Sequence, residues 1–348
     1  MRNLRDVVAL KKASSRHLSA SDPRVHVEHR AGRGRCVFAA VLIPAGTAID
    51  EVSGPALAAC LLRSNGSRCE HCFCDLSASS PIVCACPRGC GATYCSQKCR
   101  HDDFIKWDHE RAFAAELTLG AHAKQSEDLS AEALPESLDR FGTLLLAVRL
   151  LWMRHQICEG KERVADSGLR VTADEDEDDV CRLLDELAEG PIVSDDLELA
   201  AIAATTAGFL PPHVSPTHVV SMIGSVRVNC AAFTDSAGLI IGVGLYPKQA
   251  RLNHSCWPNC VLSYGARGAV RVRTLRDVGV GEEMLITYTD PSTPTEERRA
   301  VLQQRWGFVC ECSRCTCSSE GTDPYSTSDV ENLLEAAHRA QLREASST

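Results

Sequence analysis

The chain has 348 residues, 44% hydrophobic and 24% charged, an ordinary globular composition long enough to bury a sizeable core. A formal net charge of −9 argues against broad contact with nucleic acid phosphates, and the lack of any apolar run of about 18 residues argues against a membrane span. The chain has 19 cysteines and its first residues lack a secretory pattern, so we expect reduced thiols and zinc ligands rather than disulfides.

The first part of the chain predicts strands joined by glycine turns. Residues 1–24 show no periodicity, whereas residues 25–28 alternate like a strand. Gly32-Arg33-Gly34 follows, and two glycines one residue apart permit a tight turn or a close approach of the backbone to a ligand. The plain turn is the commoner meaning of so short a pattern. Residues 43–51 predict a Pro-x-Gly turn and a further strand.

Closely spaced cysteine pairs fill the next stretch. Tetrahedral zinc takes its ligands in such pairs, so the spacing predicts zinc binding. The pairs are Cys69 with Cys72, Cys86 with Cys90, and Cys95 with Cys99, and Trp107 and His109 follow them.

Residues 114–220 predict helices. The leucine-rich segment 144–152 is too apolar for an exposed helix and predicts buried structure. The acidic run 174–179 is typical of a solvated loop or a helix N-terminus, and we assign it no chemistry.

The last third holds three blocks in a fixed order. A strand over residues 239–246 leads to Asn253-His254-Ser255-Cys256, and a Gly-Glu-Glu sequence then precedes a strand that ends at Tyr288. A short helix over residues 295–304 precedes Trp306-Gly307-Phe308 and a Cys-x-Cys-x-x-Cys sequence. A polar linker and a helix over residues 329–344 end the sequence.

These three blocks resemble the core of SET-domain protein-lysine methyltransferases, and the cysteine pairs resemble a MYND zinc finger. The resemblance implies an α+β fold in which small curved SET sheets with a pseudoknot are split by the finger and a helical insert. It lies nearer the family members that lack a C-terminal helical-repeat domain. The implied boundaries are a lead-in 1–24, SET residues 25–68, the finger 69–113, the insert 114–220, SET residues 221–290, a zinc-binding post-SET segment 291–317, and a linker with a helix 318–348.

The resemblance also implies residue roles. It assigns S-adenosylmethionine binding to Gly32, Arg33, Gly34, Asn229, Leu252, Asn253, His254 and Phe308. Asn229 and Phe233 come from residues 226–234, which resemble the family's Asn-x-Phe strand with a spacing about two residues longer. Tyr288 is the implied catalytic residue, whose hydroxyl orients the amine and the methyl group. Phe233, Trp306 and Tyr288 are the implied walls of the lysine channel.

Two or three zinc ions are implied. The first site of the finger consists of Cys69, Cys72, Cys95 and Cys99, and the post-SET site of Cys256, Cys310, Cys312 and Cys315. The second site of the finger consists of Cys86, Cys90 and His109, with Phe113 where the family has a fourth ligand. Either Cys84, His101 or Asp108 completes that site, or the site is weak or empty.

The implied activity is methyl transfer from S-adenosylmethionine to a lysine side chain of a histone or non-histone protein. The alternative is a catalytically weak adaptor whose finger binds proline-rich partner peptides. Asn253, His254, Tyr288 and Phe308 are all present, which favours the enzyme. We expect a monomer of the nucleus, the cytoplasm or both, without membrane or nucleic acid partners.

Overall fold

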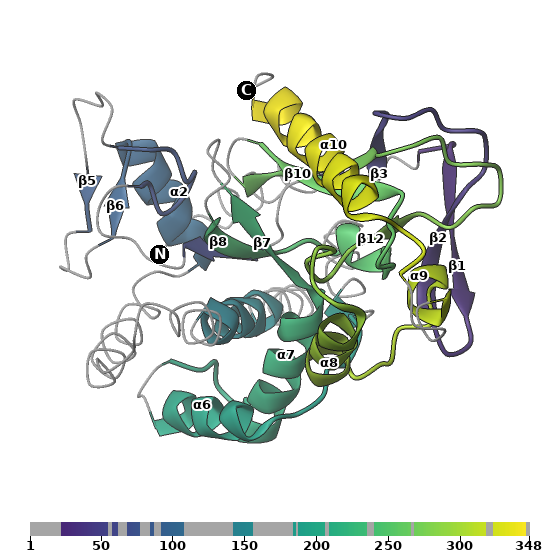
Figure 1. Ribbon diagram of the computed structural model, residues 1–348. Coiled ribbons are helices and arrows are strands. Elements are labelled where there is room, and N and C mark those ends of the chain that lie inside the picture. Colours follow the sequence, from purple (N-terminus) through teal and green to yellow (C-terminus); the bar gives the residue numbers. More distant parts are fainter. Residues whose placement is uncertain are drawn as a thin grey trace, which may run out of the picture. The chain divides into compact units, whose positions relative to one another are not determined.

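The computed structural model describes residues 22–54, 58–61, 68–76, 84–86, 92–107, 142–155, 184–185, 187–205, 209–234, 240–265, 268–317 and 323–345. The chain divides into two compact units (Figure 1). The first unit contains Leu57–Ala232 and Ile241–Leu245, and the second contains Ala20–Ala56, Phe233–Ile240 and Tyr246–Thr348. Within the described ranges, no helix has the length and apolar character needed to cross a bilayer.

The second unit is built from short strands. The strand β1 (Val25–Arg30) pairs antiparallel with β2 (Gly34–Ala39), and Gly32 and Gly34 form the turn between them with φ of +73° and +68°. The left-handed backbone at both positions is the conformation that glycine adopts without steric cost. The turn therefore depends on both glycines.

Two more sheets complete this unit. One has the antiparallel order β10 (Cys260–Tyr264), β11 (Val270–Thr274), β3 (Ala48–Gly54). The other pairs β9 (Asn253–His254) in parallel with β12 (Leu285–Ile286). Side chains from all three sheets share one apolar core, which includes Val37, Ile49, Leu252, Val272 and Ile286.

Four helical segments belong to the same unit: η1 (Gln249–Arg251), α8 (Thr295–Trp306), α9 (Ser313–Cys317) and α10 (Thr327–Ala345). The helix α8 follows Pro294, carries Glu296 and Glu297 in its first turn, and ends at Gly307 with a left-handed φ of +77°. Acidic residues at the start and a left-handed glycine at the end both stabilise a helix.

The helix α10 lies across the edge strand β10 (Figure 1). The side chain of Gln341 accepts a hydrogen bond from the Tyr264 amide at 2.8 Å and donates one to the Tyr264 carbonyl at 2.9 Å. It therefore satisfies backbone groups that an edge strand otherwise exposes.

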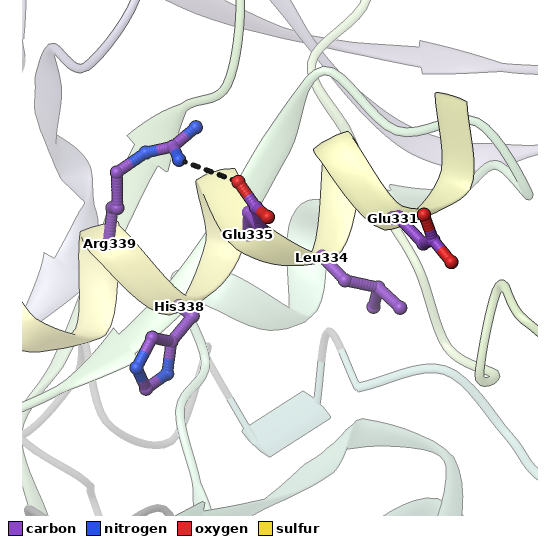
Figure 2. A pocket seen from close by; sticks show the side chains of 5 residues that line it. All are labelled: Glu331, Leu334, Glu335, His338 and Arg339. Atoms are coloured by element: carbon purple, nitrogen blue, oxygen red, sulfur yellow. Dashed lines mark hydrogen bonds and ion pairs between the residues drawn. The ribbon is translucent and has the colours of Figure 1, made fainter. Parts of the chain in front are cut away.

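A surface hollow of about 570 Å³ runs along α10, and Figure 2 shows its lining residues, Glu331, Leu334, Glu335, His338 and Arg339. Arg339 and Glu335 form an ion pair of 3.1 Å on one side of this row. None of the predicted site residues lines the hollow, so it is separate from the predicted centre of methyl transfer.

The first unit combines the finger with helices and a small sheet. The finger contains β5 (Cys84–Ala85), β6 (Thr93–Tyr94) and α2 (Gln97–Trp107). The sheet has the order β4 (Ala58–Leu61), β8 (Ile240–Leu245), β7 (Cys230–Thr234). Its helices are residues 142–155, α6 (Ser194–Thr205) and α7 (Pro216–Asn229), and their apolar faces form one core.

The described parts of the predicted helical segment form helices at residues 142–155, 184–185, 194–205 and from 216, with non-helical residues at 187–193 and 209–215, and the leucine-rich segment is buried as expected. The acidic run 174–179 lies outside the described residues. The strand expected over residues 226–234 is partly wrong, because α7 continues to Asn229 and the strand begins at Cys230. The buried residues Val219, Ile223 and Val226 recur at helical spacing, and that core contact extends the helix.

Candidate active site and metal centres

Glu283 joins the Gly-Arg-Gly turn to Asn253. One Glu283 oxygen lies 2.8 Å from Nη2 of Arg33, and the other accepts a hydrogen bond of 2.9 Å from Nδ2 of Asn253. The same Nδ2 donates to the Arg35 carbonyl at 3.0 Å and lies 3.2 Å from Sγ of Cys36. Three acceptors surround this nitrogen, which fixes the orientation of the amide.

Two predicted cofactor-binding features are therefore brought together across more than 200 residues of sequence. The turn also has room beside it, since a Cβ added at Gly32 or Gly34 meets no described atom within 4 Å. The Gly-Glu-Glu sequence alone predicts no role for Glu283. Its position as the second carboxylate of the Gly-Glu-Glu sequence was the signal available.

His254 is held in one tautomer. Its Nδ1 accepts a hydrogen bond from the Tyr288 backbone amide at 3.0 Å, so Nε2 carries the proton and donates to Sγ of Cys256 at 3.2 Å. Burial lowers the pKa of His254 to about 4, which keeps the ring neutral near pH 7. His254 thus connects the cysteine cluster to the backbone of Tyr288, in agreement with a positioning role and not with a general base.

Tyr288 is a partly buried hydrogen-bond donor. Its hydroxyl donates to the Leu252 carbonyl at 2.6 Å, and burial raises its pKa above the ordinary value of a phenol. Its ring centroid lies 5.3 Å from that of His254 and 5.0 Å from that of Trp306. Phe308 extends this aromatic group, with its centroid 6.1 Å from His254. Three predicted aromatic site residues are therefore neighbours.

The described contacts of Asn229 and Phe233 do not test their predicted roles at this site. The Asn229 carboxamide accepts from the Ala188 amide at 3.3 Å and donates to the carbonyls of Ala188 and Ser225 at 2.8 Å and 2.6 Å. Phe233 is a buried residue of β7. Their cofactor and channel roles stay predictions.

Two sets of four cysteines have their sulfur atoms within 4.8 Å of one another. They are Cys69, Cys72, Cys95 and Cys99 in the first unit, and Cys256, Cys310, Cys312 and Cys315 in the second. Sulfur–sulfur distances include 3.4 Å for Cys95–Cys99, 3.4 Å for Cys256–Cys315 and 3.9 Å for Cys256–Cys310. Tetrahedral zinc with Zn–S bonds of about 2.3 Å requires roughly 3.8 Å, so both sets fit a zinc ion.

The second site of the finger stays a prediction. Cys86 is buried next to β5, whereas Cys90, His109 and Phe113 lie outside the described residues. Cys84, one of the alternatives for the fourth ligand, is buried on β5.

Comparison with known proteins agrees with this geometry. The model of the SET domain family matches residues 34–289, which include Gly34, Asn253 and Tyr288. "N-lysine methyltransferase SMYD2" of Gallus gallus is 28% identical over 298 residues, covering 82% of this chain and 61% of that protein. "Histone-lysine N-methyltransferase SMYD3" of Homo sapiens is 39% identical over 99 residues, covering 28% of this chain and 23% of that protein.

A third relative is "Histone-lysine N-methyltransferase SET5" of Yarrowia lipolytica, 36% identical over 101 residues that cover 29% of this chain and 23% of that protein. The chain thus spans less than two thirds of the length of each of these relatives. The family match itself covers well over half of the chain. The chain therefore belongs to the SET domain family and resembles the members that combine a SET domain with a MYND finger.

Proposed function

We propose that the chain is a protein-lysine N-methyltransferase that uses S-adenosylmethionine as the methyl donor. The observation that carries the proposal is the contact of Asn253 with the Gly-Arg-Gly turn through Glu283, beside the aromatic group around Tyr288. Relatives named as lysine methyltransferases support the same reaction.

The cofactor supplies an electrophilic methyl group on a sulfonium sulfur, and the protein supplies position. Both hydrogens of the Asn253 amide are directed toward protein acceptors, so its Oδ1 is the atom that accepts a hydrogen bond from a bound ligand. The glycine turn leaves open space for the same ligand. A well-oriented pair of reactants gains roughly 7–11 kcal/mol over the unbound reactants, so fixed geometry accounts for much of the rate.

The lysine must react as a neutral amine, although its ordinary pKa is about 10.4. Aromatic side chains such as Trp306 and Tyr288 limit water, and a poorly solvated environment favours the neutral form. The raised pKa of Tyr288 keeps its hydroxyl protonated. Tyr288 therefore orients groups by donating and accepting hydrogen bonds and does not act as the base.

The two cysteine clusters hold structural zinc under this proposal. Each has four thiol ligands, which leaves no open coordination position for a substrate. The post-SET cluster stabilises the segment that carries Trp306 and Phe308, because metal-binding free energy at such sites is folding free energy.

The substrate is a lysine-bearing protein, either a histone or a non-histone protein. An adaptor whose finger binds proline-rich peptides is the alternative function. The enzyme is favoured because an adaptor has no need for a fixed Asn253 amide beside an open glycine turn.

The proposal is tested by incubating the purified chain with methyl-labelled S-adenosylmethionine and a panel of histones and cell proteins. Wild type is expected to label lysine, and Tyr288→Phe to label it much more slowly. Tyr325→Phe is the matched control, because Tyr325 stacks on Trp257 with centroids 3.7 Å apart and keeps that contact without its hydroxyl. Equal labelling by wild type and Tyr288→Phe removes Tyr288 from the mechanism, and no labelling by wild type favours the adaptor.

A further inference from the structure

Arg298 is the largest fully buried side chain among the described residues, with 1% of its surface exposed. An arginine side chain keeps its positive charge at every physiological pH. A buried charge without an opposite charge nearby is strongly unfavourable. The surroundings of Arg298 must therefore supply negative charge.

The hydrogen-bond partners of Arg298 do not supply it. Its Nη1 donates to the Thr293 carbonyl, and its Nη2 donates to Oγ1 of Thr295 at 3.0 Å, so both acceptors are neutral. Its Nε is buried and has no hydrogen-bond acceptor among the described residues. Asp323 lies in electrostatic range but is held by Arg314 through bonds of 2.7–3.1 Å.

The sulfur atoms of Cys256 and Cys315 interact electrostatically with the guanidinium of Arg298, whose helix α8 also contributes Leu302 to the same buried cluster. Leu302 lies one turn after Arg298 and packs against the cysteines. Neutral thiols do not balance a cation. Four thiolates around a divalent metal carry a net charge of −2, which does balance one.

We propose that Arg298 is an outer-sphere residue of the post-SET metal site, where its guanidinium balances the negative charge of the tetrathiolate and holds Cys256 and Cys315 in place. The proposal rests on zinc binding by these cysteines and is independent of methyl transfer. The buried charge of Arg298 and the bound metal are therefore energetically coupled, because loss of the metal leaves neutral thiols beside a buried cation.

A second hydrogen-bond donor, His254, contacts Cys256. Nε2 of His254 donates to Sγ of Cys256 from the other neighbouring element, β9. Arg299 and Arg314 contact the cluster differently, through the backbone carbonyls of Cys315 at 3.1 Å and Cys256 at 3.3 Å. Arg298 interacts with the sulfur atoms of Cys256 and Cys315 themselves.

The test compares Arg298→Met, Arg298→Lys and Arg298→Gln in the full chain. Zinc is titrated with a competing chelator, and Cys256→Ser identifies which part of the signal belongs to the post-SET site. Outer-sphere partners typically change metal affinity about 10–100-fold, so a loss of this size is expected at that site for Met and Gln, and a smaller one for Lys. Gln304→Met on the exposed face of α8 is the matched control and is expected to bind as wild type does.

Substitution of zinc by cobalt gives an absorption spectrum that reports the charge on the cysteine sulfur atoms, which a change in packing alone does not alter. The sulfur-to-cobalt charge-transfer band is expected to shift in Arg298→Gln and to lie near the wild-type position in Arg298→Lys. Wild-type zinc affinity in Arg298→Met overturns the proposal, as does an equal loss in the Lys and Gln variants. If Arg298→Met does not fold, the comparison of Lys with Gln decides the question.

Discussion

Replacement of Glu283 by alanine tests whether the observed orientation of Asn253 creates the cofactor site. The change removes one hydrogen bond to a charged acceptor, which is worth about 1.5–3 kcal/mol, and leaves Asn253 with the Arg35 carbonyl and Cys36. The ion pair with Arg33 adds little, because Arg33 is 52% exposed and such pairs contribute at most about 1 kcal/mol. We expect the Kd for S-adenosylmethionine to rise roughly 10–100-fold.

The measurement is isothermal titration calorimetry with S-adenosylmethionine and with its demethylated product, alongside steady-state kinetics. A positioning role predicts a higher KM for the cofactor with a modest change in kcat at saturation. Arg33→Ala is the comparison that removes the ion pair and keeps the Asn253 contact, and it should have a smaller effect. An unchanged Kd in a folded Glu283→Ala variant refutes the reasoning, whereas an equal loss in Arg33→Ala assigns the effect to Arg33 instead of Asn253.

Three further outcomes are expected. Burial acts to raise the pKa of Glu282, but hydrogen bonds from Arg276, the Gly279 amide and Asn259 outweigh it and lower the pKa to about 2. Glu282 therefore stabilises the fold fully above its ordinary pKa of 4.5 and loses this effect as the pH falls toward 2. Because about one third of the side chain is exposed, we expect Glu282→Gln to lower the free energy of unfolding by about 1 kcal/mol at pH 7 and by almost nothing near pH 2. Urea unfolding at the two pH values measures the difference. Asn229→Ala is expected to lower the free energy of unfolding by about 1–3 kcal/mol, since it leaves backbone groups of Ala188 unpaired. The Kd for S-adenosylmethionine is expected to stay unchanged. Weaker cofactor binding by a variant as stable as wild type supports the predicted cofactor role instead. Removal of zinc with a strong chelator is expected to abolish the near-ultraviolet circular dichroism of Trp306 and Tyr288, which pack on the post-SET cysteines, and an unchanged spectrum after full zinc loss contradicts a structural role for that metal.

Local patterns made parts of the molecule predictable from sequence. Alternation over residues 25–28 predicted β1, and the resemblance of the cysteine pairs to a MYND finger predicted the group of Cys69, Cys72, Cys95 and Cys99 that the structure brings together. The strand assigned to residues 226–229 failed, because valines at both alternating and helical spacing fit either structure until the core selects one.

Contacts between distant residues were not predictable in the same way. The pairing of Glu283 with Arg33 joins segments 250 residues apart, and nothing in the local sequence marks which carboxylate turns inward. The burial of Arg298 was equally hidden, since a Glu-Glu-Arg-Arg sequence is typical of an exposed helix face. In both cases the packing of other elements decides the side chain's surroundings.

The strand β9 places adjacent residues at two different sites, the proposed cofactor site and the post-SET cysteine cluster. Successive side chains of a strand point to opposite faces, so Asn253 turns toward Glu283 and the glycine turn while His254 turns toward Cys256. The parallel pairing of Asn253 with Leu285 and of His254 with Ile286 fixes this register, and a shift by one residue would exchange the two faces. Variants at Glu283 should therefore leave zinc affinity unchanged, whereas variants at Arg298 reach Tyr288 through His254 and through the packing of Tyr288 and Trp306 on the post-SET cysteines.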